Sequence, residues 1–214
     1  MVWRGKGIEK SGGSKKKLKV FMDYSPIKSN FAVMKHPLDK FRYCPMCGSE
    51  RFEVNNVKSK KCQACGFTYY MNPSAATVAV ITTPLPAGEG TGVGLLVVRR
   101  GKEPAKGTLD LPGGFSDMGE TSEEGVAREV LEETGLRVTR TEFLFSLPNR
   151  YVYSGLEIPT MDMFYRCEIA DTDGAHAMDD AADLMWIPLS EVDPSQFGLE
   201  SIRLGVSKLL QMLK

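Results

Sequence analysis

No stretch of this 214-residue sequence approaches the ~20 consecutive apolar residues that cross a membrane as a helix. No apolar segment of the kind found in secretory signals follows the lysines near the start of the chain. Neither charge is in excess, because 27 Lys and Arg stand against 27 Asp and Glu. These absences argue against a membrane protein or a membrane partner, and they predict a cytoplasmic protein.

The composition itself is that of a globular protein, with 42% hydrophobic residues, but the charges are unevenly spread. Residues 1–20 carry a net charge of +6, so the remaining residues carry −6. A basic tail is typical of a nucleic-acid arm, yet no aromatic residues alternate with these lysines, and Gly12–Ser14 favours disorder. We expect residues 1–35 to form a partly disordered extension, which leaves nucleic acid open as a partner without favouring it.

Four of the five cysteines form two C-x-x-C pairs that are separated by 14 residues: Cys44, Cys47, Cys62 and Cys65. Each pair supplies two thiolates from one tight turn, and Zn²⁺ binds four such ligands in a tetrahedron. Two disulfides or a redox pair are the alternative, which a cytosolic chain disfavours. Four thiolates leave no open position, so we expect a structural zinc in a zinc ribbon over residues 36–73, with a hairpin whose tip is Asn55-Asn56. The fifth cysteine, Cys167, is expected to be a buried thiol in a strand.

A second pattern, this time of acidic residues, follows the glycines at positions 113 and 114. Glu129, Glu132 and Glu133 fall at i, i+3 and i+4, so on a helix they share one face. Like charges at this spacing destabilise a helix by ~0.2–0.5 kcal/mol per pair, so the cluster predicts a bound cation. Hard carboxylate ligands suit Mg²⁺ or Mn²⁺. A solvated acidic helix face is the alternative, but it leaves the flanking glycines and Glu120 unexplained.

The same segment resembles the Nudix box, G-x5-E-x7-R-E-U-x-E-E-x-G-U, in which U is an aliphatic residue. Its nine constrained positions are all occupied, by Gly114, Glu120, Arg128, Glu129, Val130, Glu132, Glu133, Gly135 and Leu136. The resemblance implies an enzyme that hydrolyses the pyrophosphate bond of a nucleoside diphosphate linked to another group, X. It implies a small nucleotide as substrate and a catalytic Mg²⁺ or Mn²⁺ held by the three clustered glutamates, with the Gly113 carbonyl as an extra ligand.

The resemblance also assigns supporting roles in catalysis. Arg128 is expected to orient a carboxylate through a bidentate ion pair, which Lys forms poorly. Glu120 either accepts that pair or supports the loop before the helix. The general base is either a box glutamate or an acid from a downstream loop, where Asp179, Asp180 and Asp183 are the candidates. A solvated acidic loop is the alternative for these three residues.

A zinc ribbon joined directly to a Nudix domain resembles the NADH pyrophosphatase family, which implies NADH-type dinucleotides as substrates. That family carries S-Q-P-W-P-F-P-x-S about ten residues after the box, and residues 146–154 read SLPNRYVYS at that offset. Both serines, the first proline and one aromatic position match. Tyr151 and Tyr153 are candidates for stacking on a base and Arg150 for a phosphate contact, although tyrosines are also ordinary strand residues.

The departures from that motif keep other functions open. ADP-ribose or a dinucleoside polyphosphate is the alternative substrate, and removal of NAD-type caps from RNA is a further one. A nucleotide sensor that regulates transcription is the alternative from another class. Such sensors often have damaged boxes, whereas the box of this chain is whole. A homodimer is also implied, because members of the family often dimerise.

Hydrophobic patterns predict an α/β fold with helices on both sides of a mixed sheet over residues 74–214, behind the small N-terminal zinc ribbon. The order of the elements resembles that of the Nudix α/β/α sandwich. Thr121 and Glu124 predict a capping box at the start of the box helix, and Gly135 predicts its end. A final amphipathic helix is expected over residues 201–213, and a turn of helix from Leu189. Strands are expected over residues 74–83, 93–98, 138–147, 159–169 and 183–187, of which the first two could pair as a hairpin.

Overall fold

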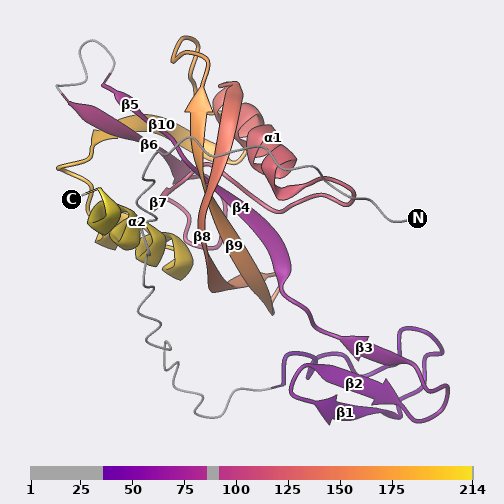
Figure 1. Cartoon of the computed structure of the whole chain (residues 1–214). Helices are drawn as coiled ribbons and strands as arrows, with labels where there is room; N and C mark the ends of the chain where they lie inside the picture. The colour runs from indigo at the N-terminus through magenta and orange to yellow at the C-terminus, as the bar shows by residue number, and fades with distance from the viewer. Residues whose placement is uncertain (1–35, 86–91, 214) are drawn as a thin grey trace, which may run out of the picture. The chain divides into compact units, whose positions relative to one another are not determined.

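The computed structural model describes residues 36–85 and 92–213 (Figure 1). The expected extension over residues 1–35 therefore lies outside the described residues. No helix in the described part of the chain is long and apolar enough to span a membrane.

The ribbon is a three-stranded antiparallel sheet in the order β1-β2-β3. Its strands are β1 (Phe52–Asn56), β2 (Ser59–Cys62) and β3 (Thr68–Tyr70). The hairpin turn lies at residues 57–58, two residues beyond the expected Asn55-Asn56 tip, because Asn56 pairs with Ser59 at the end of β1. The Asn56 side chain explains the shift: its Oδ1 accepts a hydrogen bond from the Lys58 N–H at 3.0 Å, as in an Asx turn.

The rest of the described chain contains two sheets instead of one. The first has the order β4-β9-β8, in which β4 (Ser74–Val80) runs parallel to β9 (Leu156–Ile169) and β8 (Val138–Tyr153) runs antiparallel to it. The second has the order β10-β6-β5 with β7 on β6, and its pairs are all antiparallel. Its strands are β5 (Thr82–Pro84), β6 (Val93–Arg100), β7 (Leu109–Asp110) and β10 (Ala181–Pro188).

The segment expected as one strand over residues 74–83 divides at Ile81 between these two sheets. β4 pairs with β9, whereas only β5 forms a hairpin with β6. Ile81 itself is fully buried. The apolar pattern is continuous across the division because both halves are buried, so local sequence carried no sign of the change of partner.

β8 and β9 are longer than expected and meet in a two-residue hairpin. Ser154 and Gly155 form the turn with φ of 49° and 74°, the left-handed conformations of a type I′ turn. Tyr153 therefore pairs with Leu156 across the turn. The whole segment over residues 146–153 consequently lies on β8, in register with β9.

The helices begin and end largely as the capping signals indicated. α1 (Ser122–Thr134) has the complete Thr121–Glu124 capping box, and Gly135 ends it in the left-handed conformation with φ of 72°. α2 (Glu200–Met212) closes the chain. The turn of helix expected from Leu189 is wrong: a 3₁₀ turn occurs later, at Pro194–Gln196, where the Asp193 carboxylate accepts the Ser195 N–H at 2.9 Å.

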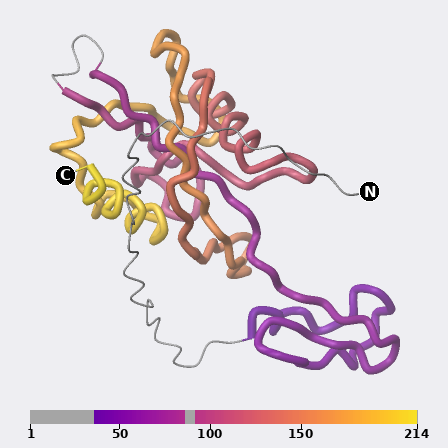
Figure 2. Tube along the Cα trace, viewed as in Figure 1, coloured from indigo at the N-terminus to yellow at the C-terminus, as the bar shows by residue number. Residues whose placement is uncertain are grey.

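The two helices cover opposite faces of the strands, as Figure 1 and Figure 2 show. Alternate residues of β4 face each helix: Ala79 joins a buried cluster with Val126 and Val130 of α1, whereas Val80 joins another with Val206 of α2. Each of these valine side chains contributes roughly 1.5–3 kcal/mol when fully buried. These two cores confirm the α/β/α sandwich, and they hold α1 and the loop before it against β4.

Candidate active site

A cavity of about 370 Å³ opens between the box helix and the edges of the two sheets. Most of the residues singled out in the box contribute to its wall: Gly113, Gly114, Arg128, Glu129, Glu132 and Glu133. β4, β6, β8 and β9 supply other parts of the wall, and Leu199 and Ile202 supply the part formed by α2. The cavity therefore extends from α1 on one face of the strands to α2 on the other.

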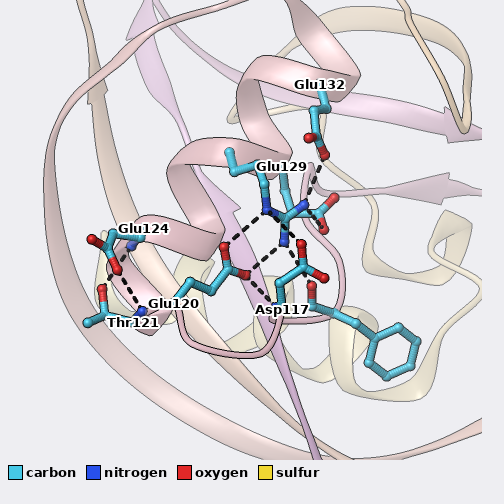
Figure 3. Close-up of polar contacts among 8 residues, drawn as sticks. Asp117, Glu120, Thr121, Glu124, Glu129 and Glu132 are labelled. Carbon is cyan, nitrogen blue, oxygen red and sulfur yellow. Dashed lines mark hydrogen bonds and ion pairs between the residues drawn. The ribbon is translucent and has the colours of Figure 1, made fainter.

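Arg128 organises the acidic side of this cavity through its hydrogen bonds to Glu120, Glu129 and Glu132, which are labelled in Figure 3. Its Nε and Nη2 donate to both oxygens of Glu120 at 3.1 and 2.8 Å, which is a bidentate pair. Its Nη1 donates to Glu129 and to Glu132, each at 2.9 Å, and Nη2 also reaches the Phe115 carbonyl at 3.0 Å. The hydrogen bond with Glu120, followed by those with the other glutamates, raises the pKa of Arg128.

Glu120 combines the two roles that the sequence left as alternatives. It accepts the pair from Arg128, and its Oε1 also accepts the Asp117 N–H at 2.6 Å, which fixes the loop before α1. The hydrogen bonds from Arg128 lower the pKa of Glu120 to about 2, with the Asp117 N–H as the next cause. Glu120 therefore stays ionised and locks the guanidinium in place.

Glu133 is the most buried of the three clustered glutamates. Its Oε2 accepts the Gly113 N–H at 3.1 Å. Burial raises the pKa of Glu133 to about 8, and the nearby charges of Asp110, Glu129 and Asp180 act in the same direction. Burial is also the first cause of the raised pKa of Glu129. Carboxylates that resist ionisation this strongly are suited to a neutralising cation.

Two glycines allow the backbone to approach these glutamates. A Cβ on Gly113 would lie 2.1 Å from the Thr77 carbonyl oxygen, and the residue has φ of 150°. A Cβ on Gly114 would lie 2.6 Å from the Glu129 carboxylate. Any side chain at either position would therefore displace β4 or the carboxylate, which explains the Gly-Gly pair by packing alone.

The oxygens of the three glutamates do not gather at one point as metal ligands do. Within the described residues, the group whose ligand atoms all lie within 4.8 Å of one another is the cysteine set. Arg128 Nη1 bridges Glu129 and Glu132 instead. The donors still fit a hard divalent cation by chemistry, because they are carboxylates beside the Gly113-Gly114 backbone.

The loop acids take three different positions. Asp179, with φ of 48°, and Asp180 line the cavity, and Asp180 forms an ion pair with Lys102. Asp183 lies outside the cavity wall, where its Oδ1 accepts the Leu184 N–H. The loop is tied to the C-terminus of α1, because the Met178 N–H donates to the Glu133 carbonyl at 2.9 Å. The same helix therefore positions both the glutamates and the loop acids.

The motif-like segment on β8 contributes one of its three candidate residues to the cavity. Tyr151 lines the wall, and its ring packs edge-on against Phe115 with centroids 5.3 Å apart. Arg150 and Tyr153 are not part of that wall; Arg150 lies 3.6 Å from Glu157, and the Tyr153 side chain is exposed. The period of two along a strand explains why Arg150 diverges from Tyr151. Tyr153 lies on the same face as Tyr151 but at the end of β8, where it pairs with Leu156 beside the turn.

Sequence reasoning missed two polar pairs in the cavity. Arg100 forms a largely buried ion pair with Asp110, and its Nη2 reaches the Tyr151 hydroxyl at 3.4 Å. Burial raises the pKa of Asp110, against the lowering effect of Arg100. Asp162 on β9 accepts hydrogen bonds from Thr160 and from Ser201. The available signal was a charged residue within an otherwise apolar strand, such as Asp110 between two leucines.

The four ribbon cysteines converge on one point. All four Sγ atoms lie within 4.8 Å of one another, with Cys44 and Cys65 at 3.7 Å and Cys47 and Cys62 at 3.6 Å. Sulfurs around a tetrahedral zinc at ~2.3 Å would be separated by about 3.8 Å. A disulfide would need about 2.05 Å. The geometry therefore matches the zinc ribbon and excludes the disulfide alternative for these pairs.

Comparison with known proteins matches this architecture and this cluster of residues. The NUDIX domain family matches residues 74–206, which is more than half of the chain and includes the whole box. The chain belongs to the Nudix family. A crystal structure of a NUDIX hydrolase from Nitrosomonas europaea has the same fold, with a TM-score of 0.59 and 21% identity over 79% of this chain and 90% of that one.

Two curated relatives of this Nudix protein have names that state a substrate. The NAD-capped RNA hydrolase NudC of Vibrio parahaemolyticus is 26% identical over 162 residues, which cover 74% of this chain and 55% of the relative. The ADP-ribose pyrophosphatase of Methanocaldococcus jannaschii is 36% identical over 86 residues, which cover 39% of this chain and 46% of the relative. The chain thus spans about half the length of the curated relatives it matches.

Proposed function

We propose that this Nudix protein is a divalent-metal-dependent pyrophosphatase that cleaves the phosphoanhydride of a nucleoside diphosphate linked to X. The observation that carries the proposal is the Arg128-centred cluster of box glutamates in the wall of a cavity that extends across the strands. NADH-type dinucleotides are the first substrate class. Support comes from the NudC relatives and from the ribbon that precedes the domain.

Glu129, Glu132 and Glu133 would hold Mg²⁺ or Mn²⁺, with the Gly113 carbonyl as an additional ligand. Such a cation neutralises charge on the phosphoryl oxygens and activates a water molecule. Arg128 positions Glu129 and Glu132 through Nη1, and Glu120 in turn fixes Arg128.

Asp179 is our first choice for the general base among the loop acids. It lines the cavity beside the box glutamates, whereas Asp180 is occupied by Lys102 and Asp183 lies outside the wall. A carboxylate on a loop that is anchored to α1 can take a proton from a water molecule held by the glutamates. Glu133 is the alternative base.

The ribbon over residues 36–73 is proposed as a separate structural module that binds Zn²⁺ through its four cysteines, ahead of a Nudix domain at residues 74–214. The zinc would have no open coordination position, because all four ligands are thiolates, so it takes no part in hydrolysis. The hydrolytic function thus belongs to the second module.

ADP-ribose is the second substrate candidate. The specific observation in its favour is the relative from Methanocaldococcus jannaschii, whose 36% identity is concentrated in 86 residues. Tyr151 and Phe115 provide an aromatic edge that could contact the adenine of either substrate. The two candidates differ in the nicotinamide half.

The deciding experiment is product analysis with Mg²⁺ or Mn²⁺ on NADH, NAD⁺, ADP-ribose and diadenosine polyphosphates. The Glu133→Gln protein is the blank, and Glu123→Gln, an exposed position on the same helix, is the matched control. We expect AMP and nicotinamide mononucleotide from NADH, with Glu123→Gln active. Turnover of ADP-ribose alone selects the second candidate. Metal-dependent turnover of none of these substrates would contradict the proposal and favour a nucleotide sensor.

A further inference from the structure

The α2 side of the cavity carries a buried carboxylate that the hydrolytic site does not use. Asp162 on β9 is 4% exposed and lines the cavity together with Thr160. Thr160 Oγ1 donates to Asp162 Oδ1 at 2.6 Å, and Ser201 Oγ of α2 donates to Oδ2 at 2.5 Å. Hydroxyl groups from two different elements therefore hold both oxygens, which gives the carboxylate one orientation.

No cation neutralises this carboxylate among the residues that the structure describes. The three cationic side chains of the cavity wall, Arg100, Lys102 and Arg128, form their ion pairs with other acids. A buried carboxylate that has no cationic partner is unfavourable for folding, and an Asn of the same shape would avoid that cost. Stability alone therefore does not explain why a carboxylate stands at position 162.

The carboxylate also keeps unused capacity for hydrogen bonds. An ionised carboxylate has about four acceptor sites, of which the Thr160 and Ser201 hydroxyls occupy two. Since Asp162 lines the cavity, the remaining sites are open to a group bound there. That group must donate a hydrogen bond, because a carboxylate repels acceptors.

The surroundings of Asp162 favour a planar ring over a sugar. Val78, Leu199 and Ile202 form apolar wall on the same side of the strands. Asn149, which pairs with Thr160 across β8 and β9, adds an amide to the wall close to the carboxylate. Apolar walls with a few polar groups at one end are typical of sites that hold a flat heterocycle.

We propose that Asp162 selects the substrate by accepting a hydrogen bond from an N–H₂ group on a planar heteroaromatic ring of the nucleotide. This inference rests on the proposed function: the box glutamates hold the pyrophosphate on the α1 side, and the ring reaches through the cavity to the α2 side. An adenine amine and a pyridine carboxamide share this chemistry. Thr160 and Ser201 are positioning residues for the carboxylate.

Calorimetric binding of mononucleotides to the full chain tests this proposal without requiring turnover. One pair of ligands is adenosine and inosine monophosphate, and a second is nicotinamide and nicotinic acid mononucleotide. Each pair exchanges the N–H₂ group for an oxygen. For one pair we expect the amine-bearing member to bind at least about tenfold more tightly, because a site built for a donor rejects its isostere. Asp162→Asn should reduce that ratio to near one, and the exposed control Asp39→Asn should keep it.

Ser201→Ala provides a second variant that keeps the charge and removes one hydroxyl that holds it. We expect it to lower the binding ratio several-fold, and this variant decides the matter if Asp162→Asn fails to fold. Equal binding within both pairs, or an unchanged ratio in Asp162→Asn, would overturn the proposal. The same applies if removing the 2′-hydroxyl of the ligand abolishes its response to Asp162, since the donor would then be a sugar hydroxyl.

Turnover of dinucleotides, measured in parallel, separates this inference from the proposed function. An Asp162-dependent binding ratio without any metal-dependent turnover would support the ring contact and contradict hydrolysis. Metal-dependent turnover with no effect of Asp162 on the binding ratio would support hydrolysis and contradict the ring contact. The two claims can therefore fail independently.

Discussion

The ribbon and the box helix each gather side chains that suit a metal, yet they do so in opposite ways. The four ribbon sulfurs already lie within 4.8 Å of one another, close to the spacing that a tetrahedral ion imposes. In the box, Arg128 Nη1 bridges Glu129 and Glu132, and Glu133 accepts a hydrogen bond from the Gly113 N–H. A structural site is closed by its own ligands, whereas a catalytic site keeps its ligands available to a substrate.

The difference follows from the elements that supply the ligands. In the ribbon, each C-x-x-C turn ends with a glycine in the left-handed conformation, Gly48 or Gly66, so each pair of sulfurs is set by a few residues. In the box, the glutamates come from one helix, but Glu133 accepts a hydrogen bond from Gly113 of the preceding loop, which packs closely against β4. The second site therefore depends on the packing of the whole domain.

The largest expected effect is the loss of zinc from the ribbon, the first of the two sites compared. Cys62→Ala removes one of the four clustered cysteines, itself fully buried, so the protein should lose its zinc completely. Structural zinc contributes roughly 10–16 kcal/mol of binding free energy in small modules, so the ribbon should unfold. Metal analysis and amide hydrogen exchange measure this loss. Glu133→Gln should retain one zinc per chain, and a Cys62→Ala protein that still holds zinc would contradict the Cys₄ site.

The next largest effect is a loss of activity when the proposed catalytic site, the second of the two, is changed. Glu133→Gln removes a metal-binding charge, which is worth several kcal/mol of transition-state stabilisation. We expect kcat to fall by about 10³-fold, because ~1.4 kcal/mol corresponds to a factor of ten. Steady-state kinetics at saturating Mg²⁺ measures the change. Glu123→Gln, on the solvent side of the first turn, should stay within about twofold of the unchanged protein, which separates charge at the site from charge on the helix.

A third prediction concerns the loop acids that α1 anchors. Asp179→Asn should lower kcat by about 10²-fold if Asp179 takes the proton from water. Asp183→Asn is the matched control, because Asp183 follows on the same stretch of chain but lies outside the cavity wall. The pH dependence of kcat distinguishes a base from a structural residue, since its acidic limb should disappear only in Asp179→Asn. Equal losses in both variants would assign the effect to the loop.

The fourth change sharpens the comparison by loosening Arg128 without removing its charge. Arg128→Lys cannot keep the bidentate pair with Glu120 and both further hydrogen bonds, because Lys lacks the planar fork. Mutation of residues that orient metal ligands typically lowers metal affinity or activity 10–100-fold. We therefore expect Arg128→Lys to lower Mg²⁺ affinity or activity about tenfold. A metal titration of activity measures it, and full activity in Arg128→Lys would remove Arg128 from a positioning role.

The smallest effect is the pH dependence of stability in the metal-free protein. Burial raises the pKa of Glu133 to about 8, above its unfolded value near 4.5, so the folded state binds the extra proton between these pH values. Stability should therefore fall as the pH rises from about 4.5 to 8. Chemical unfolding in a chelator measures this slope. Glu133→Gln should flatten it, and a slope of the same size in that variant would assign it to another group.

Several features could be read from local sequence because they depend on residues close together in the chain. The Cys₄ cluster, the capping box of α1 and the Gly135 terminus are set by turns of a few residues. The shared face of the three glutamates follows from helical spacing. The α/β/α order follows from alternating apolar patterns, since each pattern specifies which face of an element is buried.

Tertiary structure decided what local patterns could not contain. The division at Ile81, the pairing of β4 with β9 and the lengths of β8 and β9 depend on partners far along the chain. The same holds for the cavity, where Tyr151 points inward while Arg150 and Tyr153 do not. Asp162 becomes a site residue only because Ser201, 39 residues away, closes on it. Long-range packing, unlike a turn or a helix face, has no local period, so only the folded chain reveals which buried polar groups share a cavity.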